Sequence, residues 1–164
     1  MKKFLISILI CSLIIGCKFS KNIQEEKISF NESNSDLVGT WKFVKMIDQY
    51  GNKIDTIWHG QACEIVTGPL TTFNQDGTYT KIFTPKNTDT GKWIFDSQEK
   101  LLTLFLYIDS TYWVGKHLIN IKLAVKHQDN NYYEKLEYRI LKLTPDTLQI
   151  LSSGKRNMIY RKVK

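Results

Sequence analysis

The chain has 164 residues, of which 42% are hydrophobic, 24% charged and 12% aromatic, so a single globular domain is expected. This composition excludes a disordered chain, a collagen-like fibre and a disulfide-dense mini-protein. The formal net charge of +7 falls to +5 when the first sixteen residues, which include Lys2 and Lys3, are set aside. The 148 residues that remain are enough to bury a core without disulfides or metals.

The amino terminus has the three parts of a secretory signal peptide. Residues 1–3 are a short basic start, residues 4–15 form an apolar run interrupted by two serines, and Gly16-Cys17 ends it. The run is too short for a permanent membrane span, which needs about 20 residues. Residues 1–16 are therefore interpreted as a signal peptide.

The end of this segment, Leu13-Ile-Ile-Gly-Cys17, resembles the lipobox of bacterial lipoproteins. The resemblance implies cleavage before Cys17 and acylation of that residue with palmitate-like chains, which form a stable anchor. It also implies attachment to a lipid bilayer of the bacterial cell envelope, with the outer membrane as the first expectation. The alternative is an ordinary signal-peptidase site that has Cys17 beside it by chance. Residues 17–36 are then expected to be a flexible tether in front of the domain at 37–164.

Cysteine use agrees with export. Cys11 leaves with the signal peptide and Cys17 carries lipid in this interpretation, so Cys63 remains and has no partner for an internal disulfide. It is either a reactive thiol or an unpaired buried one, and burial as a small hydrophobe is the commoner case.

From Leu37 onward the sequence alternates as strands do. The strongest alternation runs from Trp113 to Val125, which predicts a long strand with one buried face. Residues 126–131 are rich in turn formers, and Tyr132 to Leu143 alternates again, so the two runs predict an antiparallel hairpin. Further turns are predicted at 74–77, 96–100, 144–146 and 153–157.

Strands separated by such short connections favour sequential antiparallel neighbours over crossing connections. The pattern is typical of an all-β sandwich or barrel. We therefore expect an up-and-down antiparallel β-barrel of about eight strands, with no major helix in the mature domain.

Several short motifs occur in an order that resembles a known family. Leu37-Val-Gly-Thr-Trp-Lys42 is similar to the Gly-x-Trp opening of lipocalins, and it is followed by Asp76-Gly-Thr-Tyr79, Gly91-Lys-Trp93 and the segment 138–148. Behind a lipobox, this order is similar to the lipocalin-like domain of small lipoproteins from Bacteroidetes-type bacteria. The resemblance implies that Gly39 and Trp41 close the barrel and that Arg161 stacks across the indole. The alternative for Arg161 is a solvated basic strand.

The interior of such a barrel is either filled by side chains or holds one small ligand. The residues expected to line a ligand site are apolar or aromatic with a few polar tips: Trp93, Phe95, Phe105, Tyr107, Trp113, His117, Tyr138 and Ile140. The alternative is that the same residues form a packed core. The apolar outer face of Leu101–Ile108 needs a cover.

The sequence shows little that points to catalysis. His59 and Cys63 form an H-x3-C pair, which is a poor zinc signature without two further ligands. No nucleophile elbow, P-loop, zinc-protease or dinucleotide motif is present in the sequence. We therefore expect no enzyme, cofactor or metal. Export and scattered lysines argue against nucleic-acid binding despite a pI near 9.2, and a monomer is expected.

Two classes of function follow. In the first, the barrel is a non-enzymatic carrier or sensor of a small hydrophobic or amphipathic molecule at the cell envelope. In the second, the barrel is filled and the domain binds a protein or glycan, or inhibits a hydrolase. The predicted loop 50–60, with Ile57 and Trp58, suits either a cavity mouth or a partner contact.

Overall fold

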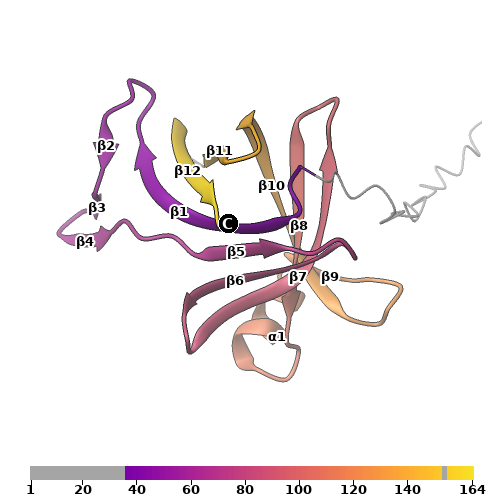
Figure 1. Ribbon diagram of the computed structural model, residues 1–164. Helices are drawn as coiled ribbons and strands as arrows, with labels where there is room; N and C mark the ends of the chain where they lie inside the picture. The colour runs from indigo at the N-terminus through magenta and orange to yellow at the C-terminus, as the bar shows by residue number, and fades with distance from the viewer. Residues whose placement is uncertain (1–35, 153–154) are drawn as a thin grey trace, which may run out of the picture.

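The computed structural model describes residues 36–152 and 155–164 (Figure 1). The predicted signal peptide, the acylation of Cys17 and nearly all of the predicted tether lie outside the described residues, so they stay predictions.

The described part of the chain forms a closed antiparallel barrel. Its eight strands are β1 (Gly39–Ile47), β5 (Leu70–Phe73), β6 (Thr78–Thr84), β7 (Asn87–Asp96), β8 (Leu101–Ile108), β10 (Tyr132–Leu143), β11 (Thr147–Ser152) and β12 (Arg156–Lys162). Each strand pairs with the next in this order, and β12 pairs with β1 to close the ring. The predicted up-and-down barrel is confirmed, and this closed eight-stranded architecture is that of the lipocalins.

The turns predicted at 74–77, 96–100 and 144–146 are found where the sequence places them, whereas residues 153–154 of the fourth lie outside the described residues. Between β5 and β6, Gly77 adopts a positive φ of 80°, and the Asp76 carboxylate accepts hydrogen bonds from the backbone and hydroxyl of Thr78 at 2.9 and 2.6 Å. Between β7 and β8, the Asp96 carboxylate accepts hydrogen bonds from the backbone N–H groups of Gln98 and Glu99. These short side chains fix the reversals locally, and so hold the strands in sequential order.

The barrel core is built from the side chains that point inward on alternate residues of each strand. It contains Leu37, Trp41, Phe73, Tyr79, Trp93, Phe95, Leu102, Leu104, Ile140, Leu148, Ile150 and Tyr160, all buried. Trp41 has no exposed surface, and its indole N–H donates a hydrogen bond to the carbonyl of Leu37 at 2.8 Å. The burial predicted for Trp41 is confirmed.

A small insertion lies between β1 and β5, to the left of the barrel in Figure 1. It contains β2 (Lys53–Ile54), which pairs with the end of β1, and a hairpin of β3 (Thr56–His59) and β4 (Ala62–Ile65). The segment 50–60 was expected to be a loop, but β3 and β4 pair with each other as a two-stranded sheet. Trp58 and Ile65 are exposed, whereas Ile57 is half-buried.

The long strand predicted from Trp113 to Val125 is wrong. Residues Trp113–Asn120 form a helix, α1, which is followed by the short strand β9 (Ala124–Lys126). The spacing explains the error, because Trp113, His117 and Ile121 are four apart and satisfy both the period of a strand and that of a helix. The turn predicted at 126–131 is present at 127–131, because Lys126 ends β9, and β9 pairs with the start of β10.

The close packing of Gly115 accompanies the helical conformation of this segment. A Cβ atom at this position would lie 2.0 Å from the carbonyl oxygen of Asp109, so the helix packs directly on the end of β8. Within residues 36–152 and 155–164, no helix is long and apolar enough to cross a bilayer.

Candidate functional site

Polar side chains enter the barrel at one end of its interior. On β6 and β7 the directly paired residues Lys81 and Asp89 have the inward parity of Tyr79 and Trp93. On β10 the residue Glu134 has the inward parity of Tyr138 and Ile140. Lys81, Asp89 and Glu134 are all half-buried. The interior therefore changes from an aromatic and aliphatic core to a polar end.

Lys81 holds a positive charge inside the barrel. Its ammonium lies 5.2 Å from the ring centre of Tyr138 and 5.9 Å from that of Tyr79, within the range of cation–π attraction. Lys81 takes part in none of the ion pairs found in the described part of the chain. Burial lowers the pKa of Lys81, and the negative charge of Asp89 opposes this effect in part.

The two tyrosines beside Lys81 remain hydrogen-bond donors. Burial raises the pKa of both Tyr79 and Tyr138, and the carboxylates of Asp89 and Glu134 raise them further by repulsion of a phenolate. Both phenols are therefore protonated at neutral pH. Lys81, Tyr79 and Tyr138 together offer donors to a polar group that enters this end.

The free space beside these groups is small. The interior cavity measures about 20 Å³ and is lined by Lys81 and Tyr138, Thr71, and the core residues Trp41, Phe73, Leu102, Leu104, Leu148, Ile150 and Tyr160. A cavity of this size holds about one water molecule. The described interior is thus a packed core with a polar end, and this cavity is too small for a large ligand.

Four of the residues predicted to line a site lie inside the barrel. Trp93, Phe95 and Ile140 are buried in the core, and Tyr138 is packed against it. The indole N–H of Trp93 donates to the carbonyl of Asn74 at 3.1 Å, so its polar tip is already engaged. Of these four, only Tyr138 borders the cavity beside Lys81.

Phe105 and Tyr107 do not line the interior, because they have the outward parity of β8. Phe105 is buried on the outside of the barrel, where its ring meets that of His127 edge-on at 5.3 Å. Tyr107 is 43% exposed, and its ring meets that of Tyr133 at 6.2 Å. Side chains of the segment between β9 and β10, and of β10, therefore cover this strand.

The prediction that Trp113 and His117 line the interior is also wrong. Both are exposed on α1, because the segment is a helix outside the barrel and not an inner strand.

The barrel floor differs from the prediction by one residue. Lys162, not Arg161, lies over Trp41, with its ammonium 5.1 Å from the indole ring. Trp41 pairs directly with Lys162 across β1 and β12, whereas Arg161 points outward and forms an ion pair with Asp146 at 3.2 Å. Gly39 has a φ of +126°, and a Cβ atom there would lie 2.7 Å from the Lys162 side chain.

A second hollow lies on the outer face of the barrel. It has a volume of about 370 Å³ and is lined by Thr78, Tyr79, Thr80, Thr90, Gly91, Lys92, Tyr107 and Tyr133. At its edge Asp129 accepts hydrogen bonds from Lys92 at 2.5 Å and from the Tyr133 hydroxyl at 2.8 Å. The hollow is open to solvent and combines aromatic rings with hydroxyl groups.

The region of His59 and Cys63 shows no metal site. Cys63 is exposed on β4, so the expectation of a buried thiol is wrong. His59 lies 3.6 Å from the Glu64 carboxylate. No group of three or more potential metal ligands occurs among the described residues.

Sequence reasoning missed Lys81, Asp89 and Glu134. The available signal was parity, because Lys81 is two residues from Tyr79 and Glu134 is two and four residues from Leu136 and Tyr138.

Comparison with known proteins finds two solved structures that are similar to this chain in fold. No protein-family model matches the chain, and no curated protein matches it. A lipocalin-like protein from Bacteroides uniformis is 17% identical with a TM-score of 0.47, covering 78% of this chain and 99% of its own. An uncharacterized protein from Bacteroides eggerthii is 12% identical with a TM-score of 0.48, covering 77% and 99%. The strand pairing itself carries the conclusion that this chain has a lipocalin-like β-barrel fold.

Proposed function

We propose that this chain is a non-enzymatic, lipid-anchored protein of the bacterial cell envelope whose barrel binds a small amphipathic molecule at its polar end. The observation that carries the binding is Lys81, a half-buried ammonium that forms no ion pair among the described residues. It lies against the rings of Tyr79 and Tyr138 and borders the interior cavity. A buried charge of this kind gains free energy when a ligand supplies an acceptor.

The size and charge of this end limit the ligand. A cavity of about 20 Å³ admits one polar group, so the body of the ligand lies at the mouth and not in the core. Asp89 and Glu134 lie at the same end and repel multiply charged anions. The chemistry favours a polar group that carries a single negative charge or none, attached to an apolar body.

The anchoring part of the proposal rests on the sequence. Residues 1–3 are basic, residues 4–15 are apolar, and Cys17 directly follows Gly16, the pattern that resembles a lipobox. Mass spectrometry of the native protein should show an acylated peptide that begins at Cys17. A Cys17→Ser chain that partitions fully with membranes as a cleaved, unlipidated product would contradict acylation as the anchor.

Binding is tested by calorimetry with decanoate, which has one carboxylate and a short apolar body. Binding should be saturable and should raise the melting temperature, because a ligand that binds only the folded state stabilises it. Lys81→Met should weaken binding about tenfold, by loss of one charge-assisted hydrogen bond. The matched control is Lys42→Met, on the outward face of β1, which should leave binding unchanged. Equal affinity of the two variants would contradict a site at Lys81.

A second function is favoured by the outer hollow of about 370 Å³. Its tyrosine rings and threonine hydroxyls are suited to the face and hydroxyl groups of a sugar, and the barrel core remains packed when it is used. Binding of a glycan that is lost in Tyr107→Ala and kept in Lys81→Met would support this interaction module over the carrier.

A further inference from the structure

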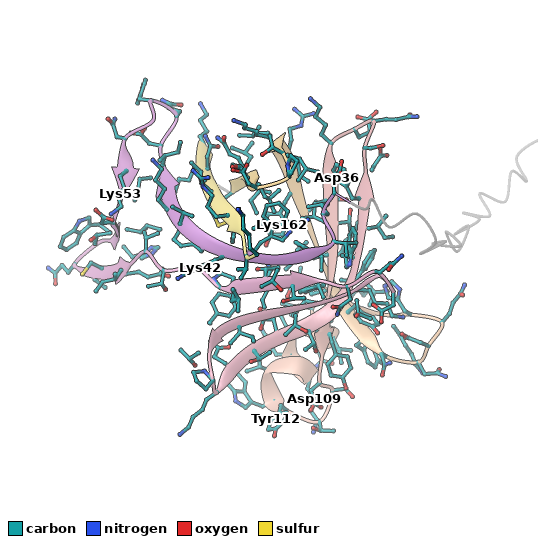
Figure 2. The ribbon with its side chains drawn as sticks, in the orientation of Figure 1. Asp36, Lys42, Lys53, Asp109, Tyr112 and Lys162 are labelled. Carbon is teal, nitrogen blue, oxygen red and sulfur yellow. The ribbon has the colours of Figure 1, made fainter. Side chains whose placement is uncertain are left out.

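The surface of α1 and β9 carries exposed apolar side chains that the barrel does not need. We define the apolar face as Tyr112, Trp113, Val114, Ile121, Leu123 and Val125, which are 67%, 78%, 47%, 49%, 52% and 59% exposed. Tyr112 is labelled at the lower edge of the molecule in Figure 2, and α1 follows it directly in the sequence. Six large apolar side chains in fourteen residues are more than scattered surface hydrophobes.

Helix α1 carries apolar side chains on both of its faces. Gly115 packs on the carbonyl of Asp109 and Leu118 and Ile119 are half-buried, whereas Trp113, Val114 and the following Ile121 are exposed. Residues four apart share one face of a helix, so Trp113, His117 and Ile121 form an outward stripe. A surface helix normally turns its apolar stripe inward. The outward stripe is therefore suited to an apolar or interfacial environment.

The charges around the apolar face are of one sign. Residues 110–128 contain Lys116, Lys122 and Lys126 and no Asp or Glu. All three lysines are exposed. Of the acidic residues that bracket the segment, Asp129 is paired with Lys92, whereas Asp109 accepts hydrogen bonds from Thr111 and keeps its charge beside Tyr112. The three lysines outnumber this one carboxylate, so the rim is positive on balance.

From this combination we infer that the apolar face of α1 and β9 docks on a membrane surface that contains anionic lipid. Trp and Tyr prefer the level of the lipid headgroups, and the aliphatic side chains reach the boundary of the acyl chains. Lysines near an anionic bilayer add electrostatic attraction. A protein partner that fits this face would need a matching acidic surface, whereas a bilayer supplies both the apolar depth and the diffuse negative charge.

This inference goes beyond the proposed anchor, because it assigns an orientation to the domain. The eighteen residues between Cys17 and Asp36 span at most about 65 Å when fully extended, so an anchored chain can reach the bilayer with α1. Docking on this face would hold the barrel in one orientation on the membrane.

Two exposed tryptophans provide the test. Trp113 lies on α1 and is 78% exposed, and Trp58 lies on the β3–β4 hairpin and is 69% exposed, while Trp41 and Trp93 are buried. The full chain is reconstituted in phosphatidylcholine vesicles with about a third phosphatidylglycerol, and with acyl chains brominated near the headgroup. In Trp58→Phe the emission should be quenched by the brominated lipid. In Trp113→Phe at least about half of that quenching should be lost, because the interfacial tryptophan is gone.

A lysine series tests the electrostatic part. The triple variant Lys116→Gln, Lys122→Gln, Lys126→Gln should reduce quenching at Trp113 at least about twofold on the anionic vesicles, and less on neutral vesicles. The matched control substitutes Lys42, Lys100 and Lys142, which are exposed elsewhere, and should leave quenching unchanged. Near-ultraviolet circular dichroism confirms that each variant is folded.

The outcomes separate the two proposals. Sedimentation with vesicles reports the anchor, whereas quenching reports the position of α1. Quenching that is equal in the two tryptophan variants, or that stays with Trp58, overturns docking through α1 even when the chain sediments. A Trp113-dependent dimer in solution together with unquenched Trp113 on vesicles would assign the face to a protein contact and would also overturn it.

Discussion

The ammonium of Lys162 lies 5.1 Å from the ring centre of Trp41, and it also donates a hydrogen bond to the carbonyl of Asp36 at 3.2 Å. The Lys162 side chain therefore covers the face of the indole and connects Asp36, just before β1, to the end of β12. Trp41 itself has no exposed surface and donates to the carbonyl of Leu37. The floor of the barrel is closed by a lysine–tryptophan pair, where the family resemblance implied an arginine.

This pair predicts a difference between neighbouring residues of β12. Lys162→Ala should lower the free energy of unfolding by about 1 kcal/mol, through loss of the cation–π contact and the hydrogen bond. Arg161→Ala removes an exposed ion pair and should cost under about 0.5 kcal/mol. Urea denaturation measures both. A larger effect of Arg161→Ala would contradict the assignment of the cover to Lys162.

Loss of the indole is expected to be much more costly. Trp41→Ala should lower the free energy of unfolding by about 3–5 kcal/mol, because it opens a large cavity in the core. Val44→Ala on the same strand is the control and should cost far less, since Val44 is 48% exposed. A Trp41→Ala protein that loses under about 1 kcal/mol would show that the floor is not part of the cooperative core.

Lys81 gives a prediction about stability at alkaline pH. Burial lowers its pKa below 10.5, so between the two values the unfolded chain binds more protons than the folded one. Stability contributed by this group therefore rises with pH through that window. Lys81→Met should be more stable than the wild type at pH 7 by about 1 kcal/mol, because it removes a buried charge.

The stability advantage of Lys81→Met over the wild type should shrink as the pH approaches 10.5. Because both proteins contain the same tyrosines, the titration of the tyrosines cancels when their free energies of unfolding are compared. Thermal unfolding at a series of pH values measures it. An advantage that is constant from pH 7 to 10.5 would mean that the amine is solvated.

The pattern of inward residues explains how far the sequence predicts this fold. Turn residues such as Asp76 and Gly77 act locally, so the order of strands follows from them without knowledge of the rest of the chain. The strand predicted at 113–125 is wrong because the apolar residues of this segment fit the period of a helix as well as that of a strand. The close packing of Gly115 on Asp109 is compatible with the helix, and no sequence pattern reveals this contact.

The sequence predicts the residues of the site less well than the fold, because the face of a strand on which a residue lies depends on the register of that strand. Met158 and Tyr160 are the inward residues of β12, and the same parity leads to Lys162 and not to Arg161. Phe105 and Tyr107 were assigned inward because Leu101–Ile108 is apolar on both parities, and the cover of its outer face comes from His127 and Tyr133, distant in sequence. Lys81 was missed because a charge inside a barrel conflicts with the rule that apolar residues point inward.

Asp129 should control stability in acid. Its environment is partly buried, which raises the pKa, but the hydrogen bonds from Lys92, Tyr133 and the backbone of Asn131 outweigh this and hold the pKa well below 3.8. The stability that Asp129 contributes is then fully present above pH 3.8 and is lost as the pH falls toward its folded-state pKa. Asp129→Asn should lower the free energy of unfolding at pH 7 by about 1–3 kcal/mol, as expected for hydrogen bonds to a charged group. The difference between this variant and the wild type in free energy of unfolding should narrow below pH 3.8.

Asp55→Asn, which breaks an exposed ion pair with Lys53, is the control and should lower the free energy of unfolding by under about 0.5 kcal/mol at either pH. Chemical denaturation at pH 7 and pH 3 measures both variants, and an Asp129→Asn difference that does not depend on pH would show that the carboxylate is not stabilised by folding.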